Sequence, residues 1–293
     1  MTGMRVRVGV RVAALVVLVV AAAGCDLATP QGAGPLRFRD EVFTGVTTTP
    51  DIVYGSAVSQ TGVTTTLRAD LYEPAGDTMG ARPLVIWIHG GSFAFGTRTS
   101  PEIVDQANVF SRKGYVNASI SYRLSAQGCT VANAACVESI VDAIEDAQAA
   151  VRFFRAHADE YGIDPDRIAV AGTSAGAITA LNVAYQTPVP GNSGTPGVSS
   201  KVDSAVSLSG GVIFTGSVTP DDVNTLMFHG TADVVVPYAW AQATANEAGK
   251  DGLAGYLISW EGEGHVPYVQ HRAQIHDLTT NFLFHTLDVR PLL

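Results

Sequence analysis

The stretch Arg167-Ile168-Ala169-Val170-Ala171-Gly172-Thr173-Ser174-Ala175-Gly176 decides how this chain folds. Its small and β-branched apolar residues predict a short buried strand, and residues 177–185 predict a helix. The five residues at the junction fit the pattern G-x-S-x-G. A strand, a sharp turn and a helix in this order are what a nucleophile elbow requires, because the turn lifts the Ser174 hydroxyl above the strand end. The five-residue pattern alone is weak evidence in a glycine-rich chain, so the surrounding sequence has to decide.

Strands and helices are predicted on both sides of this stretch. A continuous apolar run indicates a strand buried on both faces at 83–88. Strands that alternate with helices in the second half imply a mostly parallel sheet covered on both faces, and we expect one α/β domain over residues 36–293. The other predicted strands are 36–43, 51–58, 64–73, 115–121, 202–208, 225–228 and 255–259, and the other helices are 137–161, 239–248 and 269–284.

Composition narrows the possible functions. With 46% apolar and 15% charged residues, the 293-residue chain is typical of a globular protein with a sizeable core rather than a disordered one. Its net charge of −9, without any basic block, argues against nucleic acid as a partner. The sequence contains no internal repeat and no heptad pattern, and it does not indicate an oligomeric state.

The N-terminus is typical of a targeting segment. Arg5, Arg7 and Arg11 form a positive region, and residues 13–23 follow as an uninterrupted apolar run. This run is short for a membrane-spanning helix and has the length of a signal-peptide core. Residues 1–24 are therefore predicted to be a signal peptide that lies outside the fold.

The end of this apolar run favours lipidation. Ala22-Ala23-Gly24-Cys25 resembles a bacterial lipobox, in which the cysteine is lipidated and becomes the mature N-terminus, although leucine is commoner at the first position. Ordinary secretion with an incidental Cys25 is the alternative. Residues 25–35, polar and with glycine and proline, are predicted to be a tether, and the membrane is expected as a partner only through this anchor.

Export changes how the remaining cysteines are interpreted. Cys129 and Cys136 would face an oxidising compartment, and six residues lie between them. A disulfide would close a small loop, with a stabilisation on the order of 2 kcal/mol. A metal site is the alternative, but two cysteines without a nearby histidine make a poor zinc shell. The disulfide is favoured.

A second glycine-rich loop follows the strand predicted at 83–88. It reads His89-Gly90-Gly91-Ser92-Phe93, and its glycines allow backbone N–H groups to turn toward a developing oxyanion. Gly91, Ser92 and Ala175 are the predicted oxyanion-hole donors. An ordinary glycine turn is the alternative interpretation.

An acid and a histidine follow two later strands. Asp233 lies just past the strand at 225–228, and His265 lies just past the strand at 255–259. The side chains that follow parallel strands gather at one edge of the sheet. A serine hydroxyl needs an imidazole to remove its proton, and a carboxylate orients that imidazole. Ser174, Asp233 and His265 are therefore the predicted catalytic residues.

Both assignments have structural alternatives. An aspartate in a strand-to-helix loop is often only a turn residue or a helix cap. His229 is the competing histidine, but it precedes the acid at a strand end, so we interpret it as structural. The remaining histidines fall in predicted helices and need no special role: His157, His271, His276 and His285.

These motifs together resemble the α/β-hydrolase superfamily, in its bacterial carboxylesterase/lipase branch with an HGG-type oxyanion loop. The similarity runs from about 67 to 285 and includes LRADLYEP, HGGSF, SISYRL, YGIDP, GTSAG, HGTAD and GEGH. One departure is Ser92, where many members have a third glycine, although its N–H can still donate. The resemblance implies hydrolysis of a small-molecule ester through an acyl-enzyme on Ser174, with no cofactor and no metal.

Two other functions stay open. A catalytically inactive member of this fold could serve as a binding protein, although the order serine, acid, histidine argues against it. Amide or peptide hydrolysis is the alternative within the enzymes.

The resemblance also suggests where a lid would lie. Residues 209–224, where caps are commonly inserted in this fold, hold three glycines and a proline and predict a loop rather than a helical cap. The remaining wall is expected to be residues 123–137, stiffened by Cys129 and Cys136. An uncapped, shallow site gives a long acyl chain little to bind, so we expect short-chain esters to be the best substrates.

Overall fold

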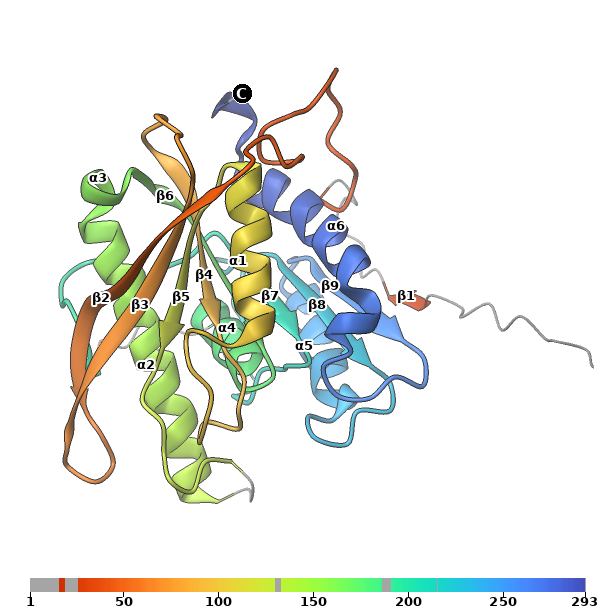
Figure 1. Ribbon diagram of the computed structural model, residues 1–293. Helices are drawn as coiled ribbons and strands as arrows, with labels where there is room; N and C mark the ends of the chain where they lie inside the picture. The colour runs from red at the N-terminus through yellow and green to blue at the C-terminus, as the bar shows by residue number, and fades with distance from the viewer. Residues whose placement is uncertain (1–15, 19–25, 130–132, 186–190, 215, 293) are drawn as a thin grey trace, which may run out of the picture.

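The computed structural model describes residues 16–18, 26–129, 133–185, 191–214 and 216–292. In this part of the chain the strands form one sheet in the order β1-β9-β8-β7-β6-β4-β5-β3-β2 (Figure 1). The strands are β1 (Val16–Leu18), β2 (Val46–Val58), β3 (Thr64–Pro74), β4 (Arg82–Ile88), β5 (Val116–Ser121), β6 (Ile163–Thr173), β7 (Ser204–Leu208), β8 (Thr225–Gly230) and β9 (Gly255–Trp260).

Six neighbouring strands, β5, β4, β6, β7, β8 and β9, run parallel to one another. β3 pairs antiparallel with β5, and β2 pairs antiparallel with β3. Because the parallel strands share a direction, their carboxyl ends lie at one edge of the sheet, where an open α/β sheet places its site. This is the α/β-hydrolase arrangement expected from the sequence.

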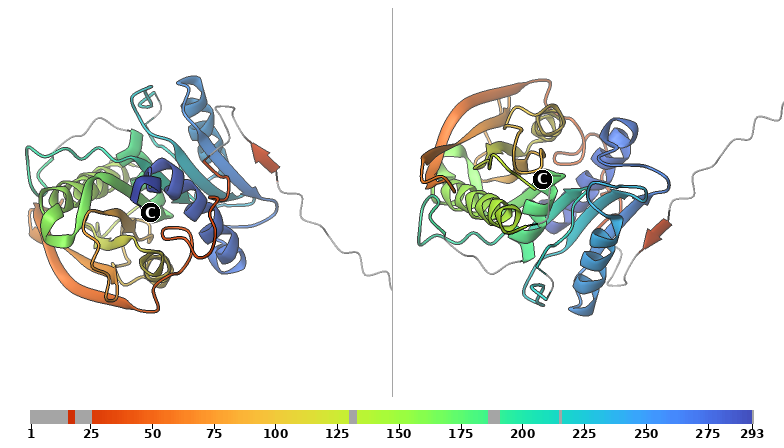
Figure 2. Two further views of the ribbon diagram at one scale, coloured as in Figure 1. Left: turned by 90° about the horizontal axis from the view of Figure 1, so that it is seen from above. Right: turned by 90° about the horizontal axis from the view of Figure 1, so that it is seen from below.

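Helices cover both faces of the sheet, as both views of Figure 2 show. α2 (Ala134–Ala156), α4 (Ala175–Tyr185) and α5 (Tyr238–Lys250) pack on one face, and α1 (Pro101–Lys113) and α6 (Tyr268–Thr286) pack on the other. β4 contributes to both cores in alternation: Leu84, Ile86 and Ile88 point to the first face, and Val85 and Trp87 to the second. This two-residue period explains why its sequence is apolar throughout.

The structure differs from the sequence-based expectation in three elements. The strand predicted at 36–43 is wrong: the Asp40 amide donates to the Leu36 carbonyl oxygen at 2.8 Å, and this turn buries the Phe38 side chain at a φ of 66°. α1 was not predicted, although Pro101 at its start and the apolar spacing of Ile103, Ala107 and Phe110 are helix signals. The helix predicted at 137–161 begins at Ala134 and divides into α2 and a short α3 (Ala158–Tyr161).

The N-terminal segment also differs from expectation. Residues 25–35 were predicted to be a tether, but the Asp26 carboxylate accepts a hydrogen bond from Asn224 at 2.9 Å, and the Leu27 carbonyl oxygen accepts one from Asn281 at 3.1 Å. Leu27 packs against the core between the sheet and helices α1 and α6. Burial of this apolar side chain favours a segment docked on the domain over a free linker.

Part of the predicted signal peptide lies beside the sheet. Val16–Leu18, expected outside the fold, form β1, which pairs antiparallel with β9. An edge strand such as β9 offers unpaired backbone groups with which an apolar segment can pair. Residues 1–15 and 19–25, which include Cys25, lie outside the described residues, so signal peptide and lipidation stay predictions.

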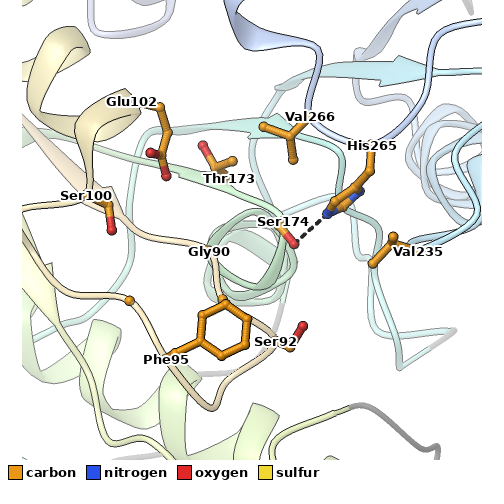
Figure 3. Close-up of a pocket in the computed structure, with 12 residues that line it drawn as sticks. Gly90, Ser92, Phe95, Ser100, Glu102, Thr173, Ser174, Val235, His265 and Val266 are labelled. Carbon is orange, nitrogen blue, oxygen red and sulfur yellow. Dashed lines mark hydrogen bonds between the residues drawn. The ribbon is translucent and has the colours of Figure 1, made fainter.

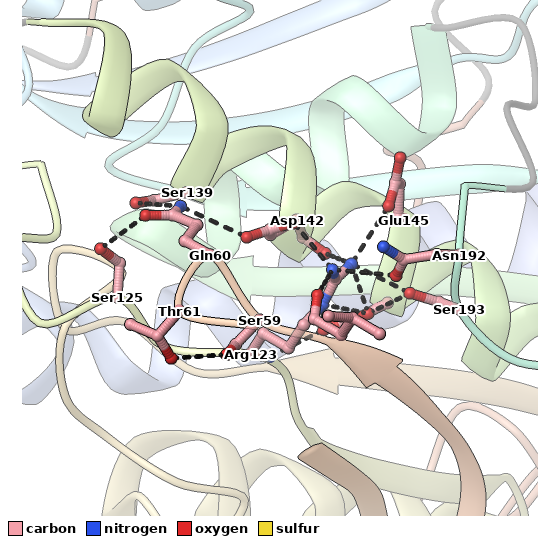
Figure 4. Close-up of polar contacts among 12 residues, drawn as sticks. Ser59, Gln60, Thr61, Arg123, Ser125, Ser139, Asp142, Glu145, Asn192 and Ser193 are labelled. Atoms are coloured by element: carbon pink, nitrogen blue, oxygen red, sulfur yellow. Dashed lines mark hydrogen bonds and ion pairs between the residues drawn. The ribbon is translucent and has the colours of Figure 1, made fainter. Parts of the chain in front are cut away.

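A buried ionic cluster ties the end of β5 to α2 (Figure 4). The Arg123 guanidinium is 1% exposed and contacts Asp146 at 2.9 Å, Asp142 at 2.8 Å and Glu145 at 3.1 Å. It also donates to the Ser193 hydroxyl at 3.0 Å. Burial raises the pKa of the Asp146 carboxyl although Arg123 opposes this effect. Removing one partner of such a cluster leaves a buried charge without a counter-charge, which is strongly destabilising. Arg123 therefore fixes the end of β5, from which the chain continues into the disulfide loop beside the site.

Candidate active site

Ser174 lies on a strained turn between β6 and α4. Its φ of 54° is in the left-handed region, which is rare for a residue with a side chain. The flanking glycines are required by close packing: a Cβ on Gly176 would lie 2.0 Å from the Ile88 carbonyl oxygen, and one on Gly172 would lie 2.2 Å from the Gly176 carbonyl oxygen. The Ser174 amide donates to the Leu208 carbonyl oxygen at 2.8 Å, which fastens the turn to β7.

The structure brings Ser174, His265 and Asp233 into one hydrogen-bonded chain. His265 Nε2 lies 2.8 Å from Ser174 Oγ, and His265 Nδ1 lies 2.7 Å from Asp233 Oδ2 (Figure 3 for Ser174 and His265). The loop that carries His265 is held by Ser209, whose hydroxyl accepts from the Val266 amide at 3.0 Å. This arrangement is suited to removing a proton from a serine hydroxyl.

Asp233 is fixed by its own loop. Its Oδ1 accepts hydrogen bonds from the amides of Val235 at 2.9 Å and Val236 at 3.0 Å, which leaves Oδ2 for His265. Its side chain is fully buried, so this carboxylate depends on these partners. The sequence analysis did not anticipate the two amides, although an aspartate that begins a turn commonly accepts from the backbone two residues on.

His229 lies beneath this carboxylate rather than over the serine. Its Nε2 is 2.9 Å from the Val236 carbonyl oxygen and 3.1 Å from Asp233 Oδ2, and its side chain is fully buried. Burial lowers the pKa of His229, and its Nδ1 has no hydrogen-bond partner among the described residues. A neutral imidazole at this position supports the loop that holds Asp233, as the sequence analysis interpreted it.

The loop after β4 lies against the elbow. Gly91 and Ser92 line the cavity above Ser174, and Ala175 lines the neighbouring cavity. Ser92 adopts a φ of 52°, so a non-glycine residue at this position is compatible with the left-handed turn. Their N–H groups remain the proposed oxyanion donors. His89 is buried beneath the loop, stacked on Tyr122 with ring centroids 4.4 Å apart, and burial lowers its pKa to about 4.

Two cavities meet at Ser174. The first, of about 380 Å³, is lined by Ser174, His265, Glu102 and the glycines of the loop after β4 (Figure 3). The second, of about 300 Å³, is lined by Ser174 with Phe93, Ile140, Ile178, Trp240 and both cysteines of the disulfide. An ester bond at Ser174 therefore has one space on each side for its two substituents.

Cys129 and Cys136 form a disulfide, as predicted, in the wall of the second cavity. The same loop is hydrogen-bonded to the loop after β4: the Cys129 amide donates to the Ser92 carbonyl oxygen at 2.8 Å, and the Ser125 amide donates to the Phe93 carbonyl oxygen at 2.9 Å. The disulfide loop thus supports the backbone of a proposed oxyanion donor.

Removing this disulfide should affect both stability and turnover. In the Cys129→Ser/Cys136→Ser variant we expect a loss of about 2 kcal/mol in the free energy of unfolding, because a short loop is no longer closed. We also expect kcat for a short ester to fall several-fold, because Ser92 loses a rigid support. Urea unfolding and steady-state kinetics measure the two effects. A destabilised variant with unchanged kcat would show that the disulfide supports the fold alone.

Over the described residues 209–214 and 216–224 the chain forms loops without a helix, so no helical cap is formed there. Within the described residues, no group of three or more His, Cys, Asp or Glu side chains is placed to hold a metal ion. In the same part of the chain, helices long and apolar enough to span a membrane are absent.

Comparisons with known proteins agree with this fold. The BD-FAE family model matches residues 69–210, and the Abhydrolase_4 model, described as a TAP-like protein, matches residues 207–287. Esterase 2 of Thermogutta terrifontis, solved after phosphoramylation by tabun, superposes with a TM-score of 0.66 at 22% identity, over 82% of this chain and 94% of that chain.

Two curated relatives each match about half of this chain. It is 34% identical over 147 residues to the probable isoprenylcysteine alpha-carbonyl methylesterase ICMEL1 of Arabidopsis thaliana, and 28% identical over 158 residues to Lipase 1 of Geotrichum candidum. These matches cover 49% and 50% of this chain but 28% and 26% of the relatives, so the matched region is about a quarter of their length. The chain has the α/β-hydrolase fold, and its sequence is similar to proteins named as esterases and lipases.

Proposed function

We propose that this protein is a serine carboxylic ester hydrolase that acts through an acyl-enzyme on short-chain esters. The observation that carries this proposal is the unbroken hydrogen-bonded chain from Ser174 Oγ through His265 to Asp233. The esterase and lipase relatives support the same reaction class.

The proposed reaction has two halves. Ser174 Oγ attacks the ester carbonyl carbon as His265 Nε2 takes its proton, and the carbonyl electrons move to the oxygen. The amides of Gly91, Ser92 and Ala175 stabilise this oxyanion. When it collapses, the bond to the alcohol oxygen breaks, and His265 returns the proton to that oxygen. Water then attacks the acyl-enzyme in the same way and releases the carboxylic acid.

The surroundings of the second cavity support short acyl groups. Its volume is about 300 Å³, and the disulfide and Trp240 form part of its walls. With no helical cap over the described residues 209–214 and 216–224, the far end of a long acyl chain has few apolar contacts. The structural relative from Thermogutta terrifontis has been solved with propionate and with butyrate bound, which are both short acids.

A substrate panel tests this proposal. We expect nitrophenyl esters with acyl chains of two to four carbons to give the highest kcat/KM, with a fall of about tenfold or more toward long chains. Matched anilides and acetyl-xylan run beside them separate ester from amide hydrolysis. Faster turnover of the amides would indicate an amidase instead, and no turnover of any substrate would indicate a binding protein. Preference for long-chain triglyceride would contradict the short-chain assignment.

We also propose that the protein is exported and anchored by lipid on Cys25. Asp26, the next residue, is hydrogen-bonded to Asn224 directly before β8, at the end of the sheet opposite to Ser174. Because Asp26 is docked, a lipid on Cys25 would hold the membrane close to the domain. The membrane would then face the amino ends of the parallel strands. Ser174 would point away from the membrane, toward water-soluble esters.

Intact mass of the native protein tests this anchor. We expect a chain that begins at Cys25 with added acyl mass, because the lipobox-like sequence directs cleavage before a lipidated cysteine. Cys25→Ser should move the protein from the detergent phase to the aqueous phase. An unmodified N-terminus anywhere in 21–34 would exclude the lipoprotein and leave ordinary secretion.

A further inference from the structure

The two cavities at Ser174 can be assigned to the two parts of the ester. The departing alcohol oxygen must receive a proton from His265 Nε2, so the alcohol has to lie beside this imidazole. His265 lines the cavity of about 380 Å³, whereas the lining of the other cavity does not include it. The alcohol therefore occupies the larger cavity, and the acyl group occupies the smaller one.

Glu102 gives the alcohol cavity a negative charge. It lies in the first turn of α1, and its carboxylate reaches into the cavity on the same side as Thr173 (Figure 3). The Glu102 carboxylate makes no hydrogen bond or ion pair within the part of the chain that the structure describes, unlike the nearby Asp105, which pairs with Arg272. A carboxylate accepts hydrogen bonds but cannot donate them, so it selects a ligand with donors.

Thr173 supplies a second, independent observation. This residue is 3% exposed and lines the same cavity, and its Oγ1 has no hydrogen-bond partner among the described residues. A buried hydroxyl without a partner costs free energy and calls for an explanation. A substrate hydroxyl in this cavity would satisfy it.

We propose that Glu102 and Thr173 form a subsite for the alcohol part of the ester, and that this alcohol carries free hydroxyl groups, as a glyceryl or sugar ester does. The proposal rests on the proposed esterase function. The exposed ring of Phe95 and three glycines complete the cavity, and they leave room for a compact polar group. An alcohol that bears a carboxylate would be repelled by Glu102.

Two butyrate esters with the same carbon skeleton test this subsite. We expect wild-type protein to hydrolyse 2,3-dihydroxypropyl butyrate with a higher kcat/KM than propyl butyrate. In Glu102→Ala this ratio should fall about tenfold or more, because a hydrogen bond to a charged group is lost. Glu160→Ala, which removes the same charge from exposed α3, is the matched control and should keep the wild-type ratio.

Thr173→Val adds a readout that distinguishes recognition from support of the fold. The variant should not lower the melting temperature, because the hydroxyl has no partner to lose. It should still lower, several-fold, the ratio of kcat/KM for 2,3-dihydroxypropyl butyrate to kcat/KM for propyl butyrate. An unchanged ratio in both variants, with wild-type hydrolysis of propyl butyrate intact, would overturn the subsite and leave the esterase function standing.

Butyrylcholine separates hydroxyl recognition from simple attraction of a cation. If Glu102→Ala lowers kcat/KM for butyrylcholine while the ratio of the two neutral esters stays the same, the proposed alcohol class is wrong. If wild-type protein hydrolyses none of the three esters, the proposed function itself fails.

Discussion

Ser174→Ala should abolish ester hydrolysis and leave the fold intact. The expected loss in kcat is on the order of 10⁴-fold or more, because the proposed mechanism has no other group to form the acyl-enzyme. The change removes one hydroxyl, and alanine is no larger than serine at the strained φ of 54°. Activity toward a short nitrophenyl ester and a circular dichroism melt measure the two effects.

A covalent probe provides the control for this variant. A serine-directed phosphonate should add one adduct to wild-type protein, on Ser174, and none to Ser174→Ala. Peptide mapping locates the adduct. Residual activity within about tenfold of wild type, or an adduct on another residue, would remove Ser174 from the role of nucleophile.

His265→Ala should lower kcat by a similar order and remove the acidic limb of the pH–rate profile. A protonated imidazole cannot accept the Ser174 proton, so any loss of wild-type kcat/KM in acid that reports on this base should disappear with the imidazole. The 2.8 Å contact to Ser174 Oγ belongs to His265, whereas His229 contacts Asp233. If His229→Ala removed the acidic limb while His265→Ala kept it, the general base would be His229.

Acid unfolding has to be separated from an effect of pH on catalysis. Burial lowers the pKa of His89 and of His276 to about 4. In the unfolded chain a histidine titrates near 6.5, so the unfolded state takes up protons first as the pH falls from about 6.5 to about 4. Stability is therefore fully present above about 6.5 and decreases below it. Circular dichroism at each pH identifies the range in which the activity profile reports on a folded protein.

Most of the fold was predictable because its signals are local. The apolar runs that became β4 and β6 are buried on both faces, and such strands carry continuous apolar sequence. The region at 36–43 was mispredicted because its apolar residues resemble a strand, whereas a turn inserts the Phe38 side chain into the core. Tertiary packing overrode local propensity there.

The sequence by itself determined which residues meet at the candidate site. Ser174, Asp233 and His265 each follow a strand, and parallel strands bring their carboxyl ends to one edge of the sheet regardless of the loops between them. The order serine, acid, histidine along the chain indicated the role of each residue. Their proximity could be predicted without any distance, because it follows from the sheet topology.

Only the tertiary structure decided what His229 contacts and which other groups surround the three residues. His229 lies within β8 and contacts Asp233, whereas His265 lies in the loop after β9. The hydrogen bonds of the Val235 and Val236 amides and of the Ser209 hydroxyl fix the loops around them. Glu102 reaches the site from α1, far from Ser174 in sequence, and residues 26–35 dock through contacts with Asn224 and Asn281. These placements depend on long-range packing between side chains, which no local pattern in the sequence encodes.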